Sequence, residues 1–577
     1  MIYRDSTAPV EARVEDLLSR MTLEEKAGQM FHTILLMGPD GELWEGESPF
    51  GHVSTDAFVS GKLMTHFNIL QAAPPAQMAG WHNRLQELAA RTRLGIPVTI
   101  SSDPRHSFTD NPATALFAGA FSQWPEFLGM AATRDAELVR AWADIVRREY
   151  LAVGIRVALH PMADLATEPR WARAVGTFGE SAELAAELVA AYIRGIQGDE
   201  LGPHSVAAMT KHFPGGGPQK DGEDPHFAYG REQVYPGGRF EHHLIPFEAA
   251  FAAGTSQIMP YYGMPVGTDL EEVAFGFNRG VITALLREKY GFDGIVCTDW
   301  GLLNDMEIGE TTEVARAWGV EDLTPRERAR KALDAGVDQF GGEACPELIV
   351  SLVRDGEITE ERIDVSVRRL LREKFRLGLF DAAPLDPDEA TATVGRADFR
   401  AAGLEAQRRS LTLLKNDGVL PLRPGVRVYT EGVDLGPEFP TATSPADADV
   451  AILHLTAPYE PRSGNFLEAL FHAGDLSFPP SEIDRITAIA AQTPTVIVIH
   501  LDRPAVMPEI NEAASAVLAE YGADDTALTA VLTGAHSPEG QLPFDLPSSM
   551  KAVEANRPDV PHDTADPLYP FGHGLTY

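Results

Sequence analysis

The stretch Gly291-Phe292-Asp293-Gly294-Ile295-Val296-Cys297-Thr298-Asp299-Trp300-Gly301 predicts a turn, a buried strand and the edge of a functional site. Asp293-Gly294 is a typical turn pair, and the apolar run 295–297 behind it is short enough for a strand. The run stops at Asp299 and Trp300, which are poor core residues. At a strand end they suit sugar binding, because a carboxylate can attack or accept hydrogen bonds and an indole can cover a pyranose face. Taken alone, Asp299 fits better as a cap of the following loop, so the rest of the chain must decide.

Further strand-like runs end in polar residues in the same way and alternate with helical patterns such as Ala182–Ile196. They are Pro97–Asp103, Ile155–Pro161, Val206–His212, Gln257–Tyr262 and Gly336–Gly342. Strands that alternate with helices favour parallel βα units. A first strand is expected near 30–36, after a helix pair over 11–30 whose second helix Thr22 would cap. Together these elements predict an α/β fold that begins with a TIM-like (β/α)8 barrel over residues 1–385.

The chemistry of such barrels lies at the C-terminal ends of the strands. The candidate side chains at those ends are Asp103, His160, Lys211, His212, Tyr262, Asp299, Trp300 and Asp338.

The barrel pattern stops after the helical stretch Glu361–Leu379. Residues 386–403, in a Pro- and Asp-rich region, are interpreted as a linker. Residues 404–577 then show a second alternating set, with strands expected at Val426–Thr430, Asp449–Leu455, Thr495–Leu501 and Ala516–Tyr521. This set predicts an α/β sandwich domain with helices on both faces of a sheet.

The composition narrows the class of function. The net charge of −36 disfavours nucleic acid and anionic membranes as partners, whereas a small neutral carbohydrate is compatible with it. The two cysteines, Cys297 and Cys345, do not suggest a disulfide framework. The first residues contain no apolar signal core and no run of 18 apolar residues occurs, so we expect no membrane span and a cytoplasmic protein if the chain is complete. The oligomeric state stays open, a homo-oligomer included.

The segment Met209–Gly217 ends a strand with a cation and an imidazole, Lys211 and His212, followed by three glycines. Neither a helical pattern nor a Gly-Lys-Ser/Thr ending follows, so a phosphate loop is disfavoured. The pair suits hydrogen bonding to adjacent hydroxyls, although a structural salt bridge from Lys211 is equally compatible. The acidic segment Asp221–His226 matches no calcium loop and is interpreted as a solvated loop, and His242-His243 is a weak metal signal. Neither a metal nor a cofactor is predicted.

Two arginines flank a tryptophan in Glu168-Pro169-Arg170-Trp171-Ala172-Arg173. One guanidinium can donate two hydrogen bonds to vicinal hydroxyls. For one of the two we expect a structural pairing, such as that of Arg170 with Glu168.

Taken together, these segments resemble glycoside hydrolase family 3, the β-glucosidase-type enzymes, over nearly the whole chain. The matching pieces are Glu168–Arg173 with Thr177–Glu180, Lys211–Phe213, Gly291–Gly301, Leu371–Asp381 and Pro570–Gly574. Family members have a barrel followed by an α/β sandwich, in agreement with the pattern above. The resemblance implies that Asp299 is the nucleophile of a covalent glycosyl-enzyme intermediate and that Trp300 walls the leaving-group side.

The resemblance also implies the sugar-binding residues. Asp103, Arg173, Lys211 and His212 would hold hydroxyls of the non-reducing sugar, and Tyr262 would lie near the nucleophile. Family members usually carry His-Gly soon after the first aspartate, whereas this chain has Asp103-Pro104-Arg105-His106-Ser107.

In two-domain members the acid/base is a glutamate on a sandwich-domain loop. The best loop here is 457–468, and Glu460, beside a tyrosine and two prolines, is the first candidate. We expect this neighbourhood to desolvate the carboxyl group in part, which suits a general acid. Glu468 is the reserve candidate.

These features predict an exo-acting, retaining β-glycosidase that removes terminal β-D-glucosyl residues without a cofactor. Two alternatives lie within the family: a β-xylosidase, and a β-N-acetylhexosaminidase, whose members use an Asp-x-His pair as acid/base. The latter pattern is matched in part by Asp224-Pro225-His226. An alternative of another class is a non-catalytic carbohydrate-binding protein.

Overall fold

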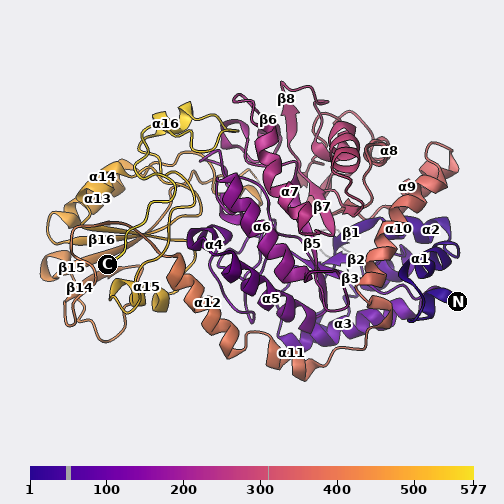
Figure 1. The fold of residues 1–577 in the computed structure, drawn as a ribbon, viewed down its shortest axis with the longest axis horizontal. Helices are drawn as coiled ribbons and strands as arrows, with labels where there is room; N and C mark the ends of the chain where they lie inside the picture. The colour runs from indigo at the N-terminus through magenta and orange to yellow at the C-terminus, as the bar shows by residue number, and fades with distance from the viewer. Residues whose placement is uncertain (47–52, 309–310, 465) are drawn as a thin grey trace.

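The computed structural model describes residues 1–46, 53–308, 311–464 and 466–577, and it consists of a barrel followed by a smaller sheet domain (Figure 1). Eight parallel strands form the barrel sheet in the order β12-β1-β2-β3-β4-β5-β7-β9. Their bounds are β1 Phe31–Ile34, β2 His66–Asn68, β3 Thr99–Ser102, β4 Ile155–Ala158, β5 Ala207–Phe213, β7 Gln257–Pro260, β9 Ile295–Val296 and β12 Phe340–Gly341. A parallel bridge between Cys297 and Gln339 joins the two ends of this order, so the sheet closes on itself.

Helices surround the barrel strands, as the alternation in the sequence predicted (Figure 1). They are α3 Pro75–Ala90, α4 Phe127–Thr133, α5 Ala136–Ala152, α6 Ala182–Gln197, α7 Ile245–Ala252, a π-helix Gly280–Lys289, α8 Pro325–Ala335, α9 Pro346–Arg354 and α10 Glu360–Arg376. The N-terminal pair, α1 Val10–Leu18 and α2 Leu23–Gln29, packs on α10. Thr22 caps α2 in a reciprocal capping box with Glu25, as its position before the helix predicted.

The segment expected as a linker is helical. It contains α11 Pro387–Thr393 and the first half of α12 Ala397–Ser410, and it runs from the barrel to the sandwich domain along the lower edge of Figure 1.

The sandwich domain contains a five-stranded sheet in the order β13-β17-β16-β15-β14. The strands are β13 Thr412–Asn416, β14 Val428–Glu431, β15 Val450–Thr456, β16 Thr495–His500 and β17 Ala516–Glu520, and the helices are α13 Pro480–Ala490, α14 Pro508–Ala513, α15 Asp525–Leu532 and α16 Met550–Ala555. On β16, Ile497 and Ile499 enter one core while Val496 and Val498 enter another. Both faces of the sheet are therefore covered, which is why its strands are almost continuously apolar.

Two strands of the two main sheets were missed from the sequence, as were the short strands outside these sheets. β2 is only three residues long and contains two polar residues, His66 and Asn68. β13 follows α12 directly and pairs antiparallel with β17, outside the parallel pattern on which the prediction relied. Two small accessory pairs complete the strands: β6 Glu232–Val234 with β8 Met264–Val266, and β10 Met306–Ile308 with β11 Thr311–Glu313.

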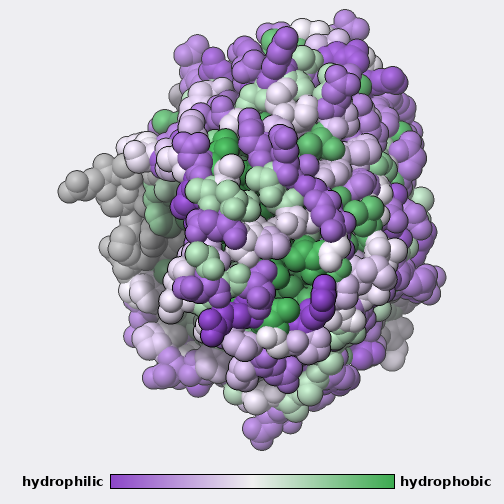
Figure 2. Space-filling model, turned by 90° about the vertical axis from the view of Figure 1, so that its left-hand side faces the viewer, coloured by the Kyte–Doolittle hydropathy of each residue, from purple (hydrophilic) through white to green (hydrophobic). Residues whose placement is uncertain are grey.

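The end of the molecule formed by the sandwich domain is mainly hydrophilic, with a small hydrophobic group near its centre (Figure 2). Within the described ranges, no helix combines the length and the apolar character that a membrane span requires.

Candidate active site

The candidate nucleophile Asp299 lies just beyond β9 and is only 7% exposed. Its Oδ1 accepts a hydrogen bond from the Trp300 amide at 2.9 Å. Its Oδ2 is buried and has no hydrogen-bond partner among the described residues, and its nearest cationic-capable neighbour is His212 Nε2 at 3.9 Å. Because a buried carboxylate oxygen without a partner is costly, it marks a place where a ligand atom belongs.

Asp103 and Lys211 face each other at the ends of β3 and β5. Lys211 Nζ lies 3.2 Å from Asp103 Oδ1, and Asn68 Nδ2 donates to Asp103 Oδ2 at 3.1 Å. Asn68 comes from β2, the strand that the sequence did not reveal, so this positioning residue was missed with it. Both carboxylate oxygens of Asp103 are held in fixed directions and retain lone pairs for sugar hydroxyls.

His212 is oriented by two neighbours. Its Nδ1 lies 2.8 Å from Asp164 Oδ2, and Arg173 Nη2 donates to its Nε2 at 3.4 Å. The proton therefore resides on Nδ1 and is donated to Asp164. Burial beside the Arg173 guanidinium lowers the pKa of His212 well below its usual range, so the imidazole is neutral. Burial raises the pKa of Asp164 to about 6 although the amides of His212 and Gly216 donate to it.

Trp300 and Tyr262 lie beside the nucleophile. Tyr262 Oη donates to the Trp300 carbonyl oxygen at 2.7 Å, and the ring of His32 contacts the indole edge-on at 5.2 Å. A Cβ on Gly342, whose φ is +70°, would lie 2.9 Å from the indole. Only glycine permits this turn and this close approach, so the indole is held against the backbone.

The loop that follows β15 contacts the barrel. Arg462 makes a two-armed ion pair with Glu223, at 2.5 and 2.7 Å, and Asn111 Nδ2 donates to the Leu470 carbonyl oxygen at 3.0 Å. The ring of Phe471 lies 5.0 Å from that of His226, on the barrel side. The segment after β15 is therefore fixed to the barrel by both polar and apolar contacts.

Glu460, the first candidate acid of this loop, is not desolvated as expected. The Glu460 side chain is 58% exposed; its carboxylate packs near Gly474 and lies 4.0 Å from Arg462. The partial desolvation predicted from the neighbouring tyrosine and prolines is wrong, because Tyr459 stacks on His472 instead, at 3.8 Å between ring centroids. Glu468 accepts a hydrogen bond from the Gly464 amide at 2.6 Å.

Two family models match the chain. Residues 51–373 match the glycosyl hydrolase family 3 N-terminal domain, and residues 438–577 match the glycosyl hydrolase family 3 C-terminal domain. The chain belongs to glycoside hydrolase family 3. The predicted family and the fold of a barrel followed by a sheet domain are thereby confirmed.

Two of the proteins that match the chain are named as β-glucosidases, one of them also as a β-xylosidase. The chain is 55% identical to a probable β-glucosidase C of Aspergillus flavus, in an alignment that covers 100% of this chain and 92% of that protein. It is 42% identical to a periplasmic β-glucosidase/β-xylosidase of Dickeya chrysanthemi, over 100% of this chain and 91% of that protein. The prediction of a β-glucosidase-type glycoside hydrolase is confirmed by these matches.

Solved structures support the same architecture. A β-glucosidase of Erythrobacter marinus superimposes with a TM-score of 0.81 at 22% identity, over 100% of this chain and 84% of that one. A β-glucosidase of Listeria innocua, solved in complex with glucose, has a TM-score of 0.75 at 22% identity, over 98% of this chain and 83% of that one.

One pair in the family 3 site was misread from the sequence. The segment Asp221–His226 is not a solvated loop, because Asp224 and His226 are 2% and 8% exposed. His226 Nδ1 lies 2.6 Å from Asp224 Oδ1, while Trp171 Nε1 donates to Asp224 Oδ2 at 3.0 Å. The ring centroids of His226 and Tyr262 lie 4.7 Å apart, so the imidazole packs directly against a residue beside the nucleophile. Only the Asp-x-His spacing signalled this pair in the sequence.

Other strand-end candidates are structural in this enzyme. His160 Nδ1 lies 2.8 Å from Tyr192 Oη, and Asp338 pairs with Arg287 and Arg369 at 2.6 and 3.0 Å. As expected for one of the two arginines, Arg170 pairs with Glu168, with Nε 2.8 Å from Oε1.

One group of described side chains brings three potential metal-ligand atoms close together. Glu180, Asp545 and His562 have ligand atoms within 4.8 Å of one another. Glu180 already accepts from the amides of Asp545 and His562, and His562 Nδ1 lies 3.1 Å from Glu180 Oε1. These contacts join the barrel to the C-terminal segment.

Proposed function

We propose that the protein is a retaining, exo-acting β-glucosidase that works by double displacement. Asp299 attacks C1 of the terminal glucosyl residue, the bond from C1 to the leaving oxygen breaks, and that oxygen takes a proton from the acid/base. Water then attacks C1 of the covalent intermediate. The same acid/base takes the proton of the water, and Asp299 is released.

The observation that carries this proposal is the unpaired, buried Oδ2 of Asp299. Its surroundings are built to bind hydroxyls: the cation of Lys211, the guanidinium of Arg173 and the ring nitrogen of His212 lie on the strands and loops around it. Fixed donors and acceptors of this kind orient a sugar ring and stabilise the charge that develops on it in the transition state.

For the acid/base we propose Glu460. A retaining pair must lie about 5–5.5 Å apart, so the proposal requires the Glu460 side chain to turn toward Asp299 when substrate binds. The Glu460 side chain is 58% exposed and its Oε2 lies 4.0 Å from Arg462, beyond hydrogen-bond distance, whereas the Glu468 carboxylate accepts a hydrogen bond from the Gly464 amide. The loop that carries both is held at the barrel by Arg462.

A leaving-group series tests this role. Glu460→Ala should cut kcat/KM strongly for alkyl β-glucosides, which need protonation, and much less for dinitrophenyl β-glucoside, which does not. Glu468→Ala and His226→Gln are the matched variants. If the leaving-group dependence appears in one of these instead, the acid role belongs to that residue; an equal loss for both substrates in Glu460→Ala contradicts the proposal.

Substrate choice within the family is tested by three nitrophenyl glycosides. We expect β-glucoside to be hydrolysed fastest, ahead of β-xyloside and N-acetyl-β-glucosaminide. The Dickeya relative is named for both glucosidase and xylosidase activity, so β-xyloside is the nearer competitor. The bonded Asp224–His226 pair is the observation that favours the hexosaminidase alternative. Fastest turnover of the N-acetyl-β-glucosaminide would establish that alternative, and sugar binding without turnover of any substrate would establish a non-catalytic protein.

A further inference from the structure

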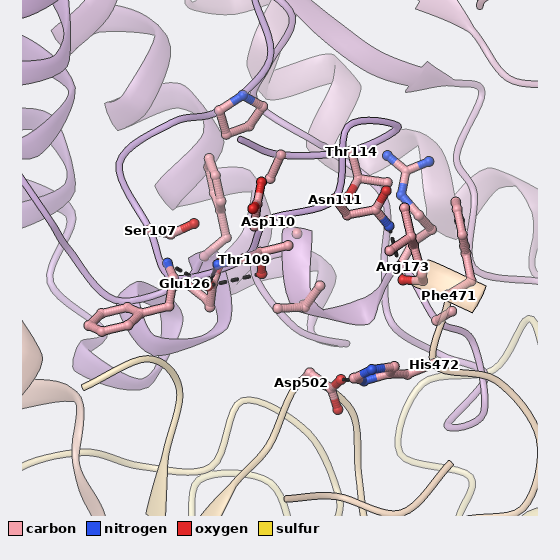
Figure 3. A pocket seen from close by; sticks show the side chains of 18 of the residues that line it. Ser107, Thr109, Asp110, Asn111, Thr114, Glu126, Arg173, Phe471, His472 and Asp502 are labelled. Carbon is pink, nitrogen blue, oxygen red and sulfur yellow. Dashed lines mark hydrogen bonds and ion pairs between the residues drawn. The ribbon is translucent and has the colours of Figure 1, made fainter. Parts of the chain in front are cut away.

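A cavity of about 300 Å³ lies between the barrel and the sandwich domain. On the barrel side it is lined by residues of the loops after β3 and β4, among them Ser107, Asn111 and Thr114. On the other side lie His472 and Asp502 of the sandwich domain, as Figure 3 shows. Its volume falls at the small end of ligand pockets, about the size that one sugar ring requires.

This cavity is distinct from the space around the nucleophile but adjoins it. Its lining does not include Asp299, Trp300 or Asp103, yet it includes Lys211 and Arg173, which belong to the candidate active site. These two cations therefore form a shared wall between the cavity and the proposed glucosyl site.

The position of the cavity in the barrel relates it to a definite end of the sugar. In the closed order of eight strands, β3 and β4 lie on the side opposite β9, which carries Asp299 at its end. With C1 held at Asp299, the hydroxyl-binding groups Asp103 and Lys211 at the ends of β3 and β5 would draw the far part of the ring, C4 and C6, toward β3 and β4. The cavity thus continues the site beyond the non-reducing end of the glucosyl residue.

The lining offers a hydrogen-bond acceptor that no protein group uses. Asp502 is 9% exposed; its Oδ2 is bonded to His472 Nδ1, while its Oδ1 is buried without a hydrogen-bond partner among the described residues. Neighbouring His472 and His500 lower the pKa of Asp502, so it is ionised. An ionised oxygen left without a partner calls for a donor such as a sugar hydroxyl.

The remaining lining fits a neutral sugar better than an anion. The lining carries Asp110, Glu126 and Asp502 but also the cations of Lys211, Arg173 and His500, so charges of both signs are mixed and no patch of one sign for an anion is formed. Glu126 is already engaged by the amides of Phe108 and Thr109. Apolar walls come from Phe127, Met162 and Phe471, and apolar faces alternating with a few polar groups are typical of sugar sites.

We propose that this cavity is a second sugar subsite, which holds a residue attached to O4 or O6 of the glucosyl unit, so that the enzyme releases a disaccharide intact. The proposal rests on the proposed β-glucosidase function and extends its substrate class to glucosides that are substituted at the non-reducing end. The bond that breaks is still the one from C1 of the inner glucosyl residue to the leaving group, and Asp299 and the acid/base act as before.

The first products of two nitrophenyl disaccharides test it. Nitrophenyl β-gentiobioside carries the outer glucose on O6 and nitrophenyl β-cellobioside carries it on O4. We expect at least one of them to yield nitrophenol and intact disaccharide in the first turnovers, followed by chromatography. If both yield only glucose and nitrophenyl glucoside at first, the subsite proposal is overturned. If nitrophenyl β-glucoside itself is not hydrolysed, the proposed function fails instead.

Filling the cavity separates the two subsites. The Thr114 side chain lines the cavity, and Thr114→Trp should lower kcat/KM for the disaccharide glycoside at least tenfold relative to that for nitrophenyl β-glucoside. Asp502→Asn, which keeps the shape but removes the charge, should shift the same ratio in the same direction. Thr526→Trp, at an exposed position on α15, is the matched control and should leave the ratio at its original value. An unchanged ratio in both cavity variants contradicts the proposal.

Discussion

Replacement of Asp103 by asparagine is the perturbation whose cost can be worked out most fully. The carboxylate is 7% exposed and its two oxygens are fixed by Lys211 at 3.2 Å and by Asn68 at 3.1 Å. An amide keeps one acceptor oxygen and presents an NH2 group to one of these donors, so it loses both the charge and one binding direction. A hydrogen bond to a charged group contributes about 1.5–3 kcal/mol. Loss of one such bond to a sugar hydroxyl, together with loss of the charge from the other, costs about 2–5 kcal/mol, or roughly 30- to 5,000-fold in kcat/KM.

The assay is the hydrolysis of nitrophenyl β-glucoside by Asp103→Asn, with the melting temperature measured in parallel. Asp269→Asn, at an exposed position after β8, is the matched control and should keep its kcat/KM. A fall of less than fivefold in a variant that melts as a folded protein would refute the role of Asp103 in holding the sugar.

Two further perturbations test a contact between the domains and a charge pair within the sandwich domain. Arg462→Ala removes the two-armed ion pair with Glu223. Because a charge-assisted bidentate pair contributes about 1–2 kcal/mol, this variant should lower kcat/KM by about five- to thirtyfold. The control Arg231→Ala removes an exposed ion pair and should leave kcat/KM unchanged; equal effects of the two variants would contradict the docking role of Arg462. Although burial opposes the charge, the Glu520 carboxylate raises the pKa of His500 to about 9. The protonated imidazole therefore stabilises the folded state fully below the unfolded pKa of about 6.5, and this contribution to the free energy of unfolding is lost as the pH rises through 9. The urea midpoint of the wild type should therefore fall between pH 6 and pH 9 more than that of His500→Gln, and parallel pH profiles would contradict it.

The barrel could be predicted because its strands obey a simple rule. Each of the longer runs is apolar until it reaches its polar C-terminal residues, and the segment before Asp299 shows this most clearly. β2 was not predicted, because a three-residue strand with two polar side chains lacks this contrast between an apolar run and a polar end. Asn68, which lies on β2, was missed for the same reason. Short strands in a closed barrel are specified by their neighbours on both sides, which a local pattern cannot reveal.

The site residues divide in the same way. Asp299, Lys211 and His212 stand at strand ends, so their place in a common site follows from the barrel alone. The pairing of Asp224 with His226 and the free oxygen of Asp502 depend on loop paths and on the packing of one domain against the other. The acidic composition around Asp224 and His226 suggested a solvated loop, and nothing in the sequence indicated the unpaired oxygen of Asp502.

The most direct measurement of the central claim is covalent trapping with a 2-deoxy-2-fluoro-β-glucoside that carries a good leaving group. The fluorine slows both steps, and the activated leaving group lets the glycosyl-enzyme intermediate accumulate. After proteolysis and mass mapping, we predict the fluoroglucosyl label on the peptide that contains Asp299, with no label in Asp299→Ala. A label on any other residue, or rapid inactivation without a covalent adduct, would contradict the mechanism.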